Sequence, residues 1–297
     1  MDYSRLPTEM QNPKTAALDK LPVKKILELM DREDALLPRI LRKLNLSLVR
    51  AVRIIVNSLK KGGRLIFVGA GTSGRLGVIE AAECPPTFGT PPGLVQAVMA
   101  GGRAAVFRSK EGSEDQVDEA RRAIRKKVRR GDVVIGISAS GVTPFVGGAL
   151  QEAKRIGART ILIASNLATP LRSKVDVLLA PRTGAEVIAG STRLKAGTAT
   201  KMILNRLTVA SMIQLGKVYG NWMVDLRPSS RKLRARALGI VKRFTGSSDG
   251  RARTLLAQAR GRVKTAILMG KKNFSYTEAL RVLRESDGFL RKALGRR

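Results

Sequence analysis

The sequence predicts an α/β protein: a doubly wound parallel sheet of about five strands, flanked by N-terminal helices and a C-terminal helical tail. Five short aliphatic runs alternate with helix-like stretches in the middle of the chain, and this alternation is typical of βαβ units. Hydrophobic residues make up 43% of the 297 residues and aromatic residues only 4%. Such aliphatic strands are typical of a sheet that is covered on both faces.

The first fifty residues predict a helical arm, residues 1–50. Apolar residues recur at spacings of three and four from Val23 to Leu59, with an interruption at Pro38. This period is that of amphipathic helices, so we expect two or three of them.

Residues 51–225 carry the expected sheet. The predicted strands are Arg64–Gly69, Gly93–Met99, Asp132–Ile137, Arg159–Ala164 and Val175–Ala180. The predicted helices between and after them are Leu76–Ala82, Asp115–Val128, Phe145–Ile156 and Lys195–Gly216.

Residues 226–297 predict a basic helical domain, because no strand-like run appears there. This part of the chain holds 20 basic and 4 acidic residues, which is about half of the net charge of +33. Helix-like stretches are Arg234–Lys242, Ala252–Arg260, Thr265–Gly270 and Glu278–Ala293. So basic a tail keeps nucleic acid open as a partner, although we do not favour it because aromatic residues for stacking are sparse.

Composition excludes several kinds of chemistry. The chain has no histidine, which removes imidazole bases and most transition-metal sites, and Cys84 is its only cysteine. We therefore expect no metal and no cofactor. The sequence opens without an apolar leader and holds no apolar run of about 18 residues, so we expect a cytoplasmic protein with no membrane contact.

Three loops rich in Ser, Thr and Gly follow predicted strands, where ligands bind in open α/β sheets. The first, Gly69–Gly74, formally fits the GxGxxG dinucleotide pattern, but no acidic residue follows the second strand to hold a ribose. The hydroxyls of Thr72 and Ser73 at an expected helix start instead favour a phosphate monoester. The other two loops are Ser138–Pro144 and Gly190–Thr198, the latter with two cations.

The loops resemble the sugar isomerase (SIS) domain, which binds phosphosugars. Longer motifs extend the resemblance over nearly the whole chain to the N-acetylmuramic acid 6-phosphate etherase family. These motifs are Gly69–Gly77, Glu83–Thr87, Glu111–Asp115, Ser191–Thr198, Gly216–Asn221 and Met223–Asp225.

The resemblance implies cleavage of the C3 lactyl ether of N-acetylmuramic acid 6-phosphate by elimination and hydration. By this resemblance Glu114 is the base that takes the C2 proton, and Glu83 is the acid that protonates the departing oxygen; Glu83 is expected just after a helix and Glu114 at the start of one. The predicted substrate-binding residues are Thr72, Ser73, Gly74, Ser140, Gly141, Thr143, Ser191, Thr192, Arg193 and Lys195. Arg193 or Lys195 offers a cation to the phosphate or to the lactate carboxylate, and the sequence does not decide which cation binds which anion. Cys84 is assigned no role.

One position departs from the family pattern: Val142 stands where the family has arginine. SIS domains commonly pair, so we expect a homodimer, with the helix of residues 195–216 as one contact face. A non-catalytic phosphosugar sensor is the alternative, and an aldose–ketose isomerase is a third reading. Both are ranked below the etherase, because the two glutamates stand in their motifs.

Overall fold

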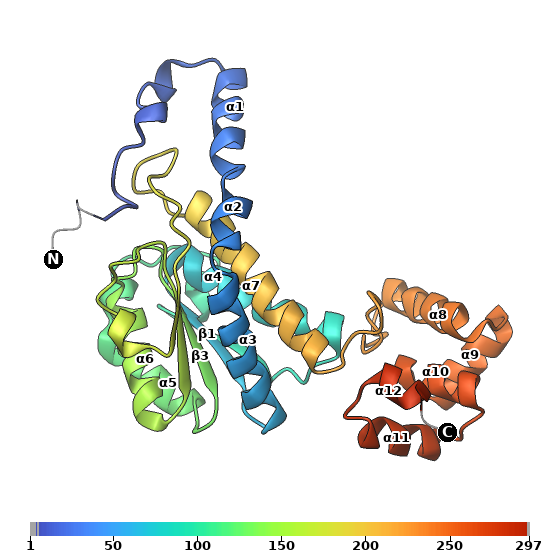
Figure 1. Cartoon of the computed structure of the whole chain (residues 1–297). Coiled ribbons are helices and arrows are strands. Elements are labelled where there is room, and N and C mark those ends of the chain that lie inside the picture. The colour runs from blue at the N-terminus through green and yellow to red at the C-terminus, as the bar shows by residue number, and fades with distance from the viewer. Residues whose placement is uncertain (1–3, 5, 296–297) are drawn as a thin grey trace. The chain divides into compact units, whose positions relative to one another are not determined.

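A computed structural model describes residue 4 and residues 6–295 of the chain. The chain forms two compact units, which are described separately (Figure 1). The first contains the described residues up to Ala81 and those from Gly93 to Thr208. The second contains Ala82–Pro92 and the described residues from Val209 onward. The domain boundaries expected at residues 51 and 226 stay predictions.

The first unit is built on a parallel sheet of five strands in the order β2-β1-β3-β4-β5, which confirms the predicted fold class. The strands are β1 (Leu65–Gly69), β2 (Val95–Met99), β3 (Val133–Ile137), β4 (Arg159–Ile163) and β5 (Val177–Leu179). Every residue of β1 and β3 is buried, because helices cover both faces of the sheet.

The first unit also contains helices of the N-terminal arm and of the βαβ units. They are α1 (Val23–Asp34), α2 (Leu37–Arg42), α3 (Asn45–Lys60), α4 (Gly71–Phe88), α5 (Val117–Lys127), α6 (Pro144–Ile156) and α7 (Lys195–Gln214). In Figure 1 α5 and α6 lie on one side of the sheet and α3 on the other. A side chain at Gly136 would place its Cβ 2.7 Å from Leu150 and Val146, so this glycine allows α6 to pack directly on β3.

The structure corrects the end of α4. We expected this helix to end at Ala82, before Pro85 and Pro86, but it continues to Phe88. The fixed φ of proline is compatible with a helix, and each proline removes one N–H donor from the last turn, so the helix continues for only two residues beyond Pro86.

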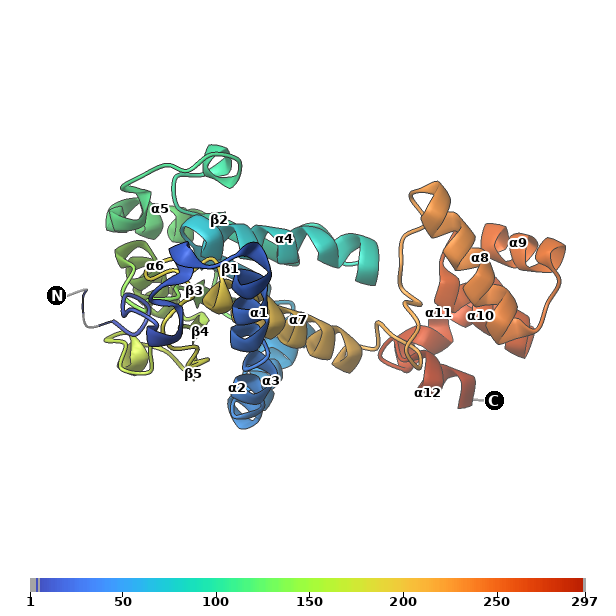
Figure 2. The ribbon, with the colours of Figure 1, turned by 90° about the horizontal axis from the view of Figure 1, so that it is seen from above.

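The tail of the second unit is helical, as predicted. Its helices are α8 (Arg231–Thr245), α9 (Asp249–Gln258), α10 (Val263–Lys272), α11 (Tyr276–Glu285) and α12 (Leu290–Gly295), which surround one apolar core (Figure 2). The single helix expected over Glu278–Ala293 is wrong. Asp287 and Gly288 have φ of 53° and 76°, a left-handed conformation that ends α11 and separates it from α12.

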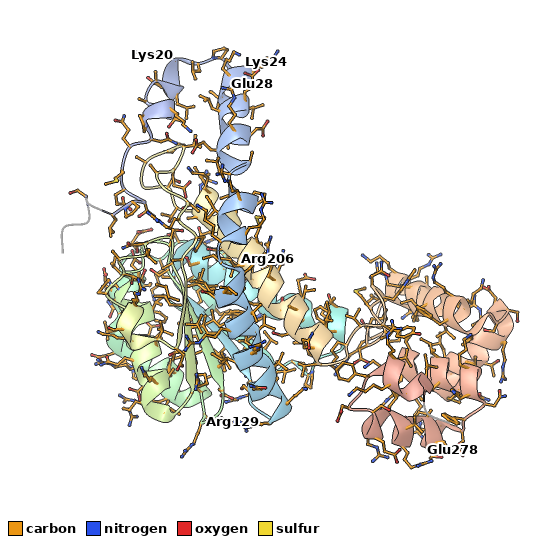
Figure 3. The ribbon with its side chains drawn as sticks, in the orientation of Figure 1. Lys20, Lys24, Glu28, Arg129, Arg206 and Glu278 are labelled. Atoms are coloured by element: carbon orange, nitrogen blue, oxygen red, sulfur yellow. The ribbon has the colours of Figure 1, made fainter. Side chains whose placement is uncertain are left out.

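The positive charge of the chain is carried largely by solvated side chains. Lys20, Lys24, Arg129 and Arg206 are exposed, and Figure 3 labels them along the first unit. Within the described residues, no helix has the length and apolar character needed to cross a membrane.

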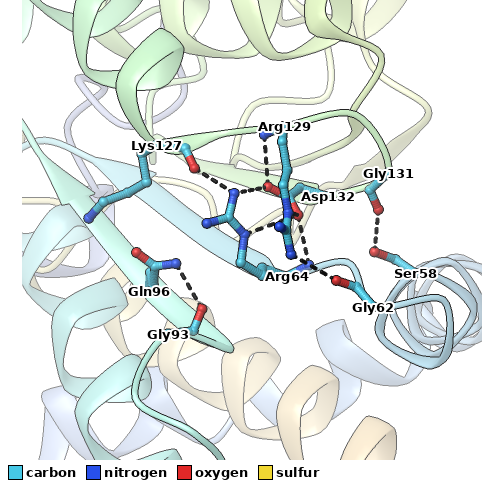
Figure 4. A network of polar contacts seen from close by, with 9 residues as sticks. All are labelled: Ser58, Gly62, Arg64, Gly93, Gln96, Lys127, Arg129, Gly131 and Asp132. Atoms are coloured by element: carbon cyan, nitrogen blue, oxygen red, sulfur yellow. Dashed lines mark hydrogen bonds and ion pairs between the residues drawn. The ribbon is translucent and has the colours of Figure 1, made fainter.

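A buried carboxylate joins the amino ends of the two central strands (Figure 4). Asp132, fully buried before β3, accepts hydrogen bonds from the backbone N–H of Arg64 and of Arg129, both at 2.9 Å. The guanidinium of Arg64 also donates to it at 2.6 Å. Asp132 thereby satisfies polar groups at the edge of the sheet and balances the charge of Arg64.

We expect Asp132→Asn to lower the free energy of unfolding of the first unit by about 3 kcal/mol, because it leaves Arg64 without its carboxylate and turns an amide toward donors. Denaturant titration followed by far-UV circular dichroism measures the change. Asp118→Asn is the matched control, since that side chain is 78% exposed, and its effect should stay within about 0.5 kcal/mol. Equal effects of the two substitutions would refute the role given to Asp132.

Candidate functional site

A pocket of about 600 Å³ opens at the carboxyl ends of β1 and β3, within the first unit. The loops that follow these strands form part of its wall, together with residues between Met99 and Asp115. The predicted site residues that line it are Thr72, Ser73, Glu114, Ser140, Thr143 and Thr192. Predicted site residues as far apart as Thr72 and Thr192 therefore meet at this edge of the sheet, where parallel α/β folds bind ligands.

The loop after β1 presents a helix start to the pocket. Helix α4 begins at Gly71, so Thr72 and Ser73 stand in its first turn, which contains no acidic residue. The backbone N–H groups of a first turn have no intrahelical acceptor and carry the positive end of the helix dipole, and both features favour a phosphate. Gly74 does not line the pocket. A Cβ there would lie 2.6 Å from the carbonyl oxygen of Gly69, so Gly74 allows the helix to pack on its strand.

The loop after β3 is held by hydroxyl groups. Ser138 shares a hydrogen bond of 2.7 Å with Thr143, and its oxygen accepts the N–H of Gly141 at 3.0 Å. Gly141, with φ of 74°, does not line the pocket; its carbonyl accepts the hydroxyl of Thr169. Helix α6 begins at Pro144, one residue before the predicted start at Phe145. Ser140 and Thr143 therefore line the pocket, whereas Gly141 serves the conformation of the turn.

The third loop does not bring its predicted cations to the pocket. Lys195 is buried, and its ammonium forms an ion pair of 2.5 Å with Glu33 of α1. Although burial acts to raise it, the hydrogen bond and charge of Lys195 hold the pKa of Glu33 below its usual value. Ser191 and Arg193 also lie outside the lining, and Arg193 is exposed. Of the whole loop, only Gly190 and Thr192 line the pocket.

Glu186 fixes the start of the helix behind this loop. Its fully buried carboxylate accepts the backbone N–H groups of Lys195 and Ala196, both at 2.9 Å. Burial raises the pKa of Glu186, although these two hydrogen bonds and the charge of Lys195 favour the ionised form. Sequence reasoning missed both Glu186 and Glu33, since neither belongs to a motif with a chemical signature.

The two predicted catalytic glutamates have different structural settings. Glu114 is exposed in a short 3-10 turn, Ser113–Asp115, that lines the pocket and precedes α5. Glu83 is an exposed residue inside α4, so the expectation that it follows the helix is wrong. Its segment, Ala82–Pro92, is grouped with the second unit. That both carboxylates act on one substrate stays a prediction.

Lys110 is a pocket residue that the sequence analysis missed. Arg75 also lines the pocket, but its guanidinium donates to the carbonyl oxygens of Val106 and Ala105, both at 2.9 Å. Among the described residues, Lys110 has neither a hydrogen bond nor an ion pair through its ammonium group. Its position directly before the Glu111–Asp115 motif is the signal that could have identified it.

The remaining charges of the pocket are acidic. Glu9, Glu111 and Asp115 line it beside Glu114, so four carboxylates face two cations. Over the part of the chain that the structure describes, no group of three or more acidic or cysteine side chains is arranged to hold a metal ion.

Comparison with known proteins identifies the family. The glucokinase regulatory protein N-terminal SIS domain matches residues 47–154, and the SIS domain matches residues 115–210. The N-acetylmuramic acid 6-phosphate etherase of Geobacillus thermodenitrificans is 47% identical over 290 residues, which cover 97% of this chain and 98% of that protein. The chain belongs to the N-acetylmuramic acid 6-phosphate etherase family. The enzyme of the same name from Rhizobium rhizogenes is 46% identical over 99% of this chain and 96% of its own length.

Solved structures agree with the fold of this etherase-family chain. A putative phosphosugar isomerase from Bacteroides fragilis superposes with a TM-score of 0.51 at 24% identity, covering 65% of this chain and 90% of its own. The phosphoheptose isomerase of Neisseria gonorrhoeae gives 0.51 at 18% identity, covering 64% of this chain and 99% of its own. At these identities the likeness shows the fold alone.

We expect stability to depend on pH in opposite directions at two buried glutamates. Folded Glu186 binds its proton more tightly than the unfolded chain does, so its contribution to stability falls as pH rises above about 4.5. Hydrogen bonds from Arg155 and Arg125 lower the pKa of Glu152 to about 2, so its contribution is present above pH 4.5 and is lost as pH falls.

The difference in unfolding free energy between the wild type and Glu186→Gln, measured from pH 4 to pH 8, should therefore decline with pH. For Glu152→Gln the same difference, followed down to pH 2, should rise between about pH 2 and pH 4.5 and then stay level. Parallel curves for the two variants would contradict the burial effect assigned to Glu186.

Proposed function

We propose that this chain cleaves the C3 ether between D-lactate and N-acetylmuramic acid 6-phosphate, giving N-acetylglucosamine 6-phosphate and D-lactate. The observation that carries the proposal is the 47% identity to a named etherase over 97% of the chain. The pocket supports it, because hydroxyls and a helix start suited to a phosphate stand beside an exposed glutamate. The proposed place of the reaction is amino-sugar catabolism and cell-wall recycling.

The chemistry requires two proton transfers. With the sugar ring open, C2 lies next to an aldehyde, so its proton is acidic enough to be removed by a carboxylate. We assign this step to Glu114, and we assign to Glu83 the proton that the ether oxygen takes as lactate leaves. Water then adds at C3 of the resulting double bond. Carboxylates suit both steps, since the chain has no histidine.

The substrate brings two anions, the 6-phosphate and the lactate carboxylate. Thr72, Ser73, Ser140 and Thr143 are proposed to bind the phosphate together with the first-turn N–H groups of α4. Lys110 is proposed to supply the cation that Val142 does not, because both residues line the same pocket.

A homodimer in the cytoplasm remains part of the proposal. Ile213 of α7 is 44% exposed and Val209 is 43% exposed, so apolar side chains are available on this helix for a second copy of the chain. Met212 is fully buried within its own chain and takes no part in such a face.

Isotope exchange separates the roles of the two glutamates. In buffer with a chelator, we expect the wild type to release lactate fully and both Glu83→Gln and Glu114→Gln to lose about 10²–10⁴-fold in rate. Glu83→Gln should still exchange the C2 hydrogen with deuterated water, whereas Glu114→Gln should not. Enzymatic lactate determination and mass spectrometry of the sugar measure the two outcomes.

Undiminished lactate release by both variants would refute the assignment. If Glu114→Gln still exchanged the C2 hydrogen and Glu83→Gln did not, Glu83 would be the base and Glu114 the acid. Loss of wild-type activity in chelator, restored by a divalent ion, would refute metal-independent chemistry.

A double-mutant cycle tests Lys110. We expect Lys110→Gln to raise KM about fivefold, since an exposed charge-assisted contact is worth about 1 kcal/mol. Val142→Arg should restore most of this loss in the Lys110→Gln background, because it returns a cation to the same pocket. Lys24→Gln is the matched control, because Lys24 is an exposed lysine of α1 outside the pocket, and it should leave KM unchanged. An unchanged KM for Lys110→Gln would exclude contact between Lys110 and the substrate.

A further inference from the structure

A second cavity, of about 930 Å³, lies wholly within the second unit. Three segments line much of it: residues 224–228, the first turn of α10 and the chain from Arg284 to Gly288. None of its lining residues belongs to the first unit, so this cavity is separate from the pocket at the carboxyl ends of the strands.

Two lysines inside this cavity share one carboxylate. The ammonium groups of Lys217 and Lys264 lie 3.0 and 2.8 Å from the same oxygen of Asp225. Lys264 is buried, with its side chain 8% exposed, and it also donates to the carbonyl of Gly288 at 2.8 Å. Burial lowers the pKa of Lys264, and the charge of Lys217 acts in the same direction. A single carboxylate leaves this partly buried pair with one uncompensated positive charge, which is costly without a counterion.

The rest of the lining adds to the positive charge. Four exposed arginines line the cavity: Arg227, Arg260, Arg262 and Arg284. The guanidinium of Arg260 lies 4.9 Å from the ring centroid of Tyr276, a cation–π contact that restricts its position. The other acidic residue of the lining, Asp287, is already paired with Lys292 at 3.5 Å.

The basic character of this cavity does not follow from the net charge alone. The first pocket belongs to the same chain of +33, yet it is lined by four acidic and two basic residues. The cavity of the second unit has the opposite balance, with six basic and two acidic residues.

The start of α10 supplies neutral donors at the same place. Its first-turn residues Val263, Lys264 and Thr265 line the cavity. The helix has no acidic residue in this turn and no side chain that caps it. Its first N–H groups therefore add hydrogen-bond donors to the ammonium and guanidinium groups, a combination suited to a tetrahedral dianion.

We propose that the cavity between α10 and residues 224–228 binds a phosphate dianion, either free orthophosphate or the phosphate group of a small ester. This inference does not depend on the proposed etherase reaction. The volume of about 930 Å³ is large enough for a phosphorylated sugar. The excess positive charge of the two lysines that share Asp225 would be balanced by the phosphate group alone, so free orthophosphate is an equally suitable ligand.

Calorimetric titration of the full chain with orthophosphate, in phosphate-free buffer, tests the proposal. We expect Lys217→Gln to weaken binding about tenfold or more, the usual value of a charge-assisted hydrogen bond. Lys232→Gln is the matched control, an exposed lysine of α8 outside the lining, and should bind as the wild type does. Ser73→Ala should also leave this binding intact, which separates it from any phosphate held in the first pocket.

Arg262→Gln provides a second test that leaves the pair on Asp225 untouched, and it should weaken binding in the same direction. Titration with N-acetylglucosamine 6-phosphate distinguishes the sources. Because this product of the proposed reaction can also bind in the first pocket, only the part of its binding that is lost in Lys217→Gln is compared with orthophosphate. If that part is tighter, the ligand is an ester, and if it is equal or weaker, the ligand is free phosphate. Phosphate affinity that is unchanged in both Lys217→Gln and Arg262→Gln would overturn the proposal. Equal losses in Lys232→Gln, or tight binding of duplex DNA without any orthophosphate binding, would also overturn it and indicate diffuse surface attraction of polyanions.

Discussion

The alignment of the two central strands is the constraint on which the first pocket depends. Asp132 joins Arg64 and Arg129 at the amino ends of β1 and β3, and the strands run in register from Leu65 opposite Val133 to Gly69 opposite Ile137. Because the strands end at the same level, the two loops that follow begin side by side. A shift of two residues would move the hydroxyls of one loop about 6.6 Å along the sheet, away from those of the other.

Buried charges support this arrangement from behind the pocket. Glu186 holds the first N–H groups of α7, and Lys195 of the same turn pairs with Glu33 of the N-terminal arm. Breaking a buried pair leaves an uncompensated charge, so these contacts tie the arm and the third loop to one geometry. Glu33, Glu186 and Lys195 are buried, whereas the hydroxyl residues proposed to bind the phosphate, in the first two loops, line the pocket.

The fold was more predictable from the sequence than the site was. Aliphatic runs such as Leu65–Val68 have few alternatives to a buried strand, so the five strands and the helices between them could be expected from local pattern. The role of Lys195 could not, because its partner Glu33 is 162 residues away and only the fold brings them together. Lys110 was missed for a related reason. Only the structure shows that the guanidinium of Arg75, the other cation of the pocket, is already hydrogen-bonded to backbone carbonyls, which leaves Lys110 as the candidate to bind an anion.

The two cavities show how one strongly basic chain can maintain different electrostatic environments. In the first pocket, hydroxyls and a helix start face four carboxylates and few cations. Full positive charges next to a carboxylate lower its pKa and weaken it as a base. In the proposed reaction, hydroxyl and backbone N–H groups hold most of the phosphate and Lys110 is the only cation that we assign to the substrate, which limits the full positive charge beside the carboxylates. The cavity of the second unit has no such requirement, and there the lysines and arginines can concentrate.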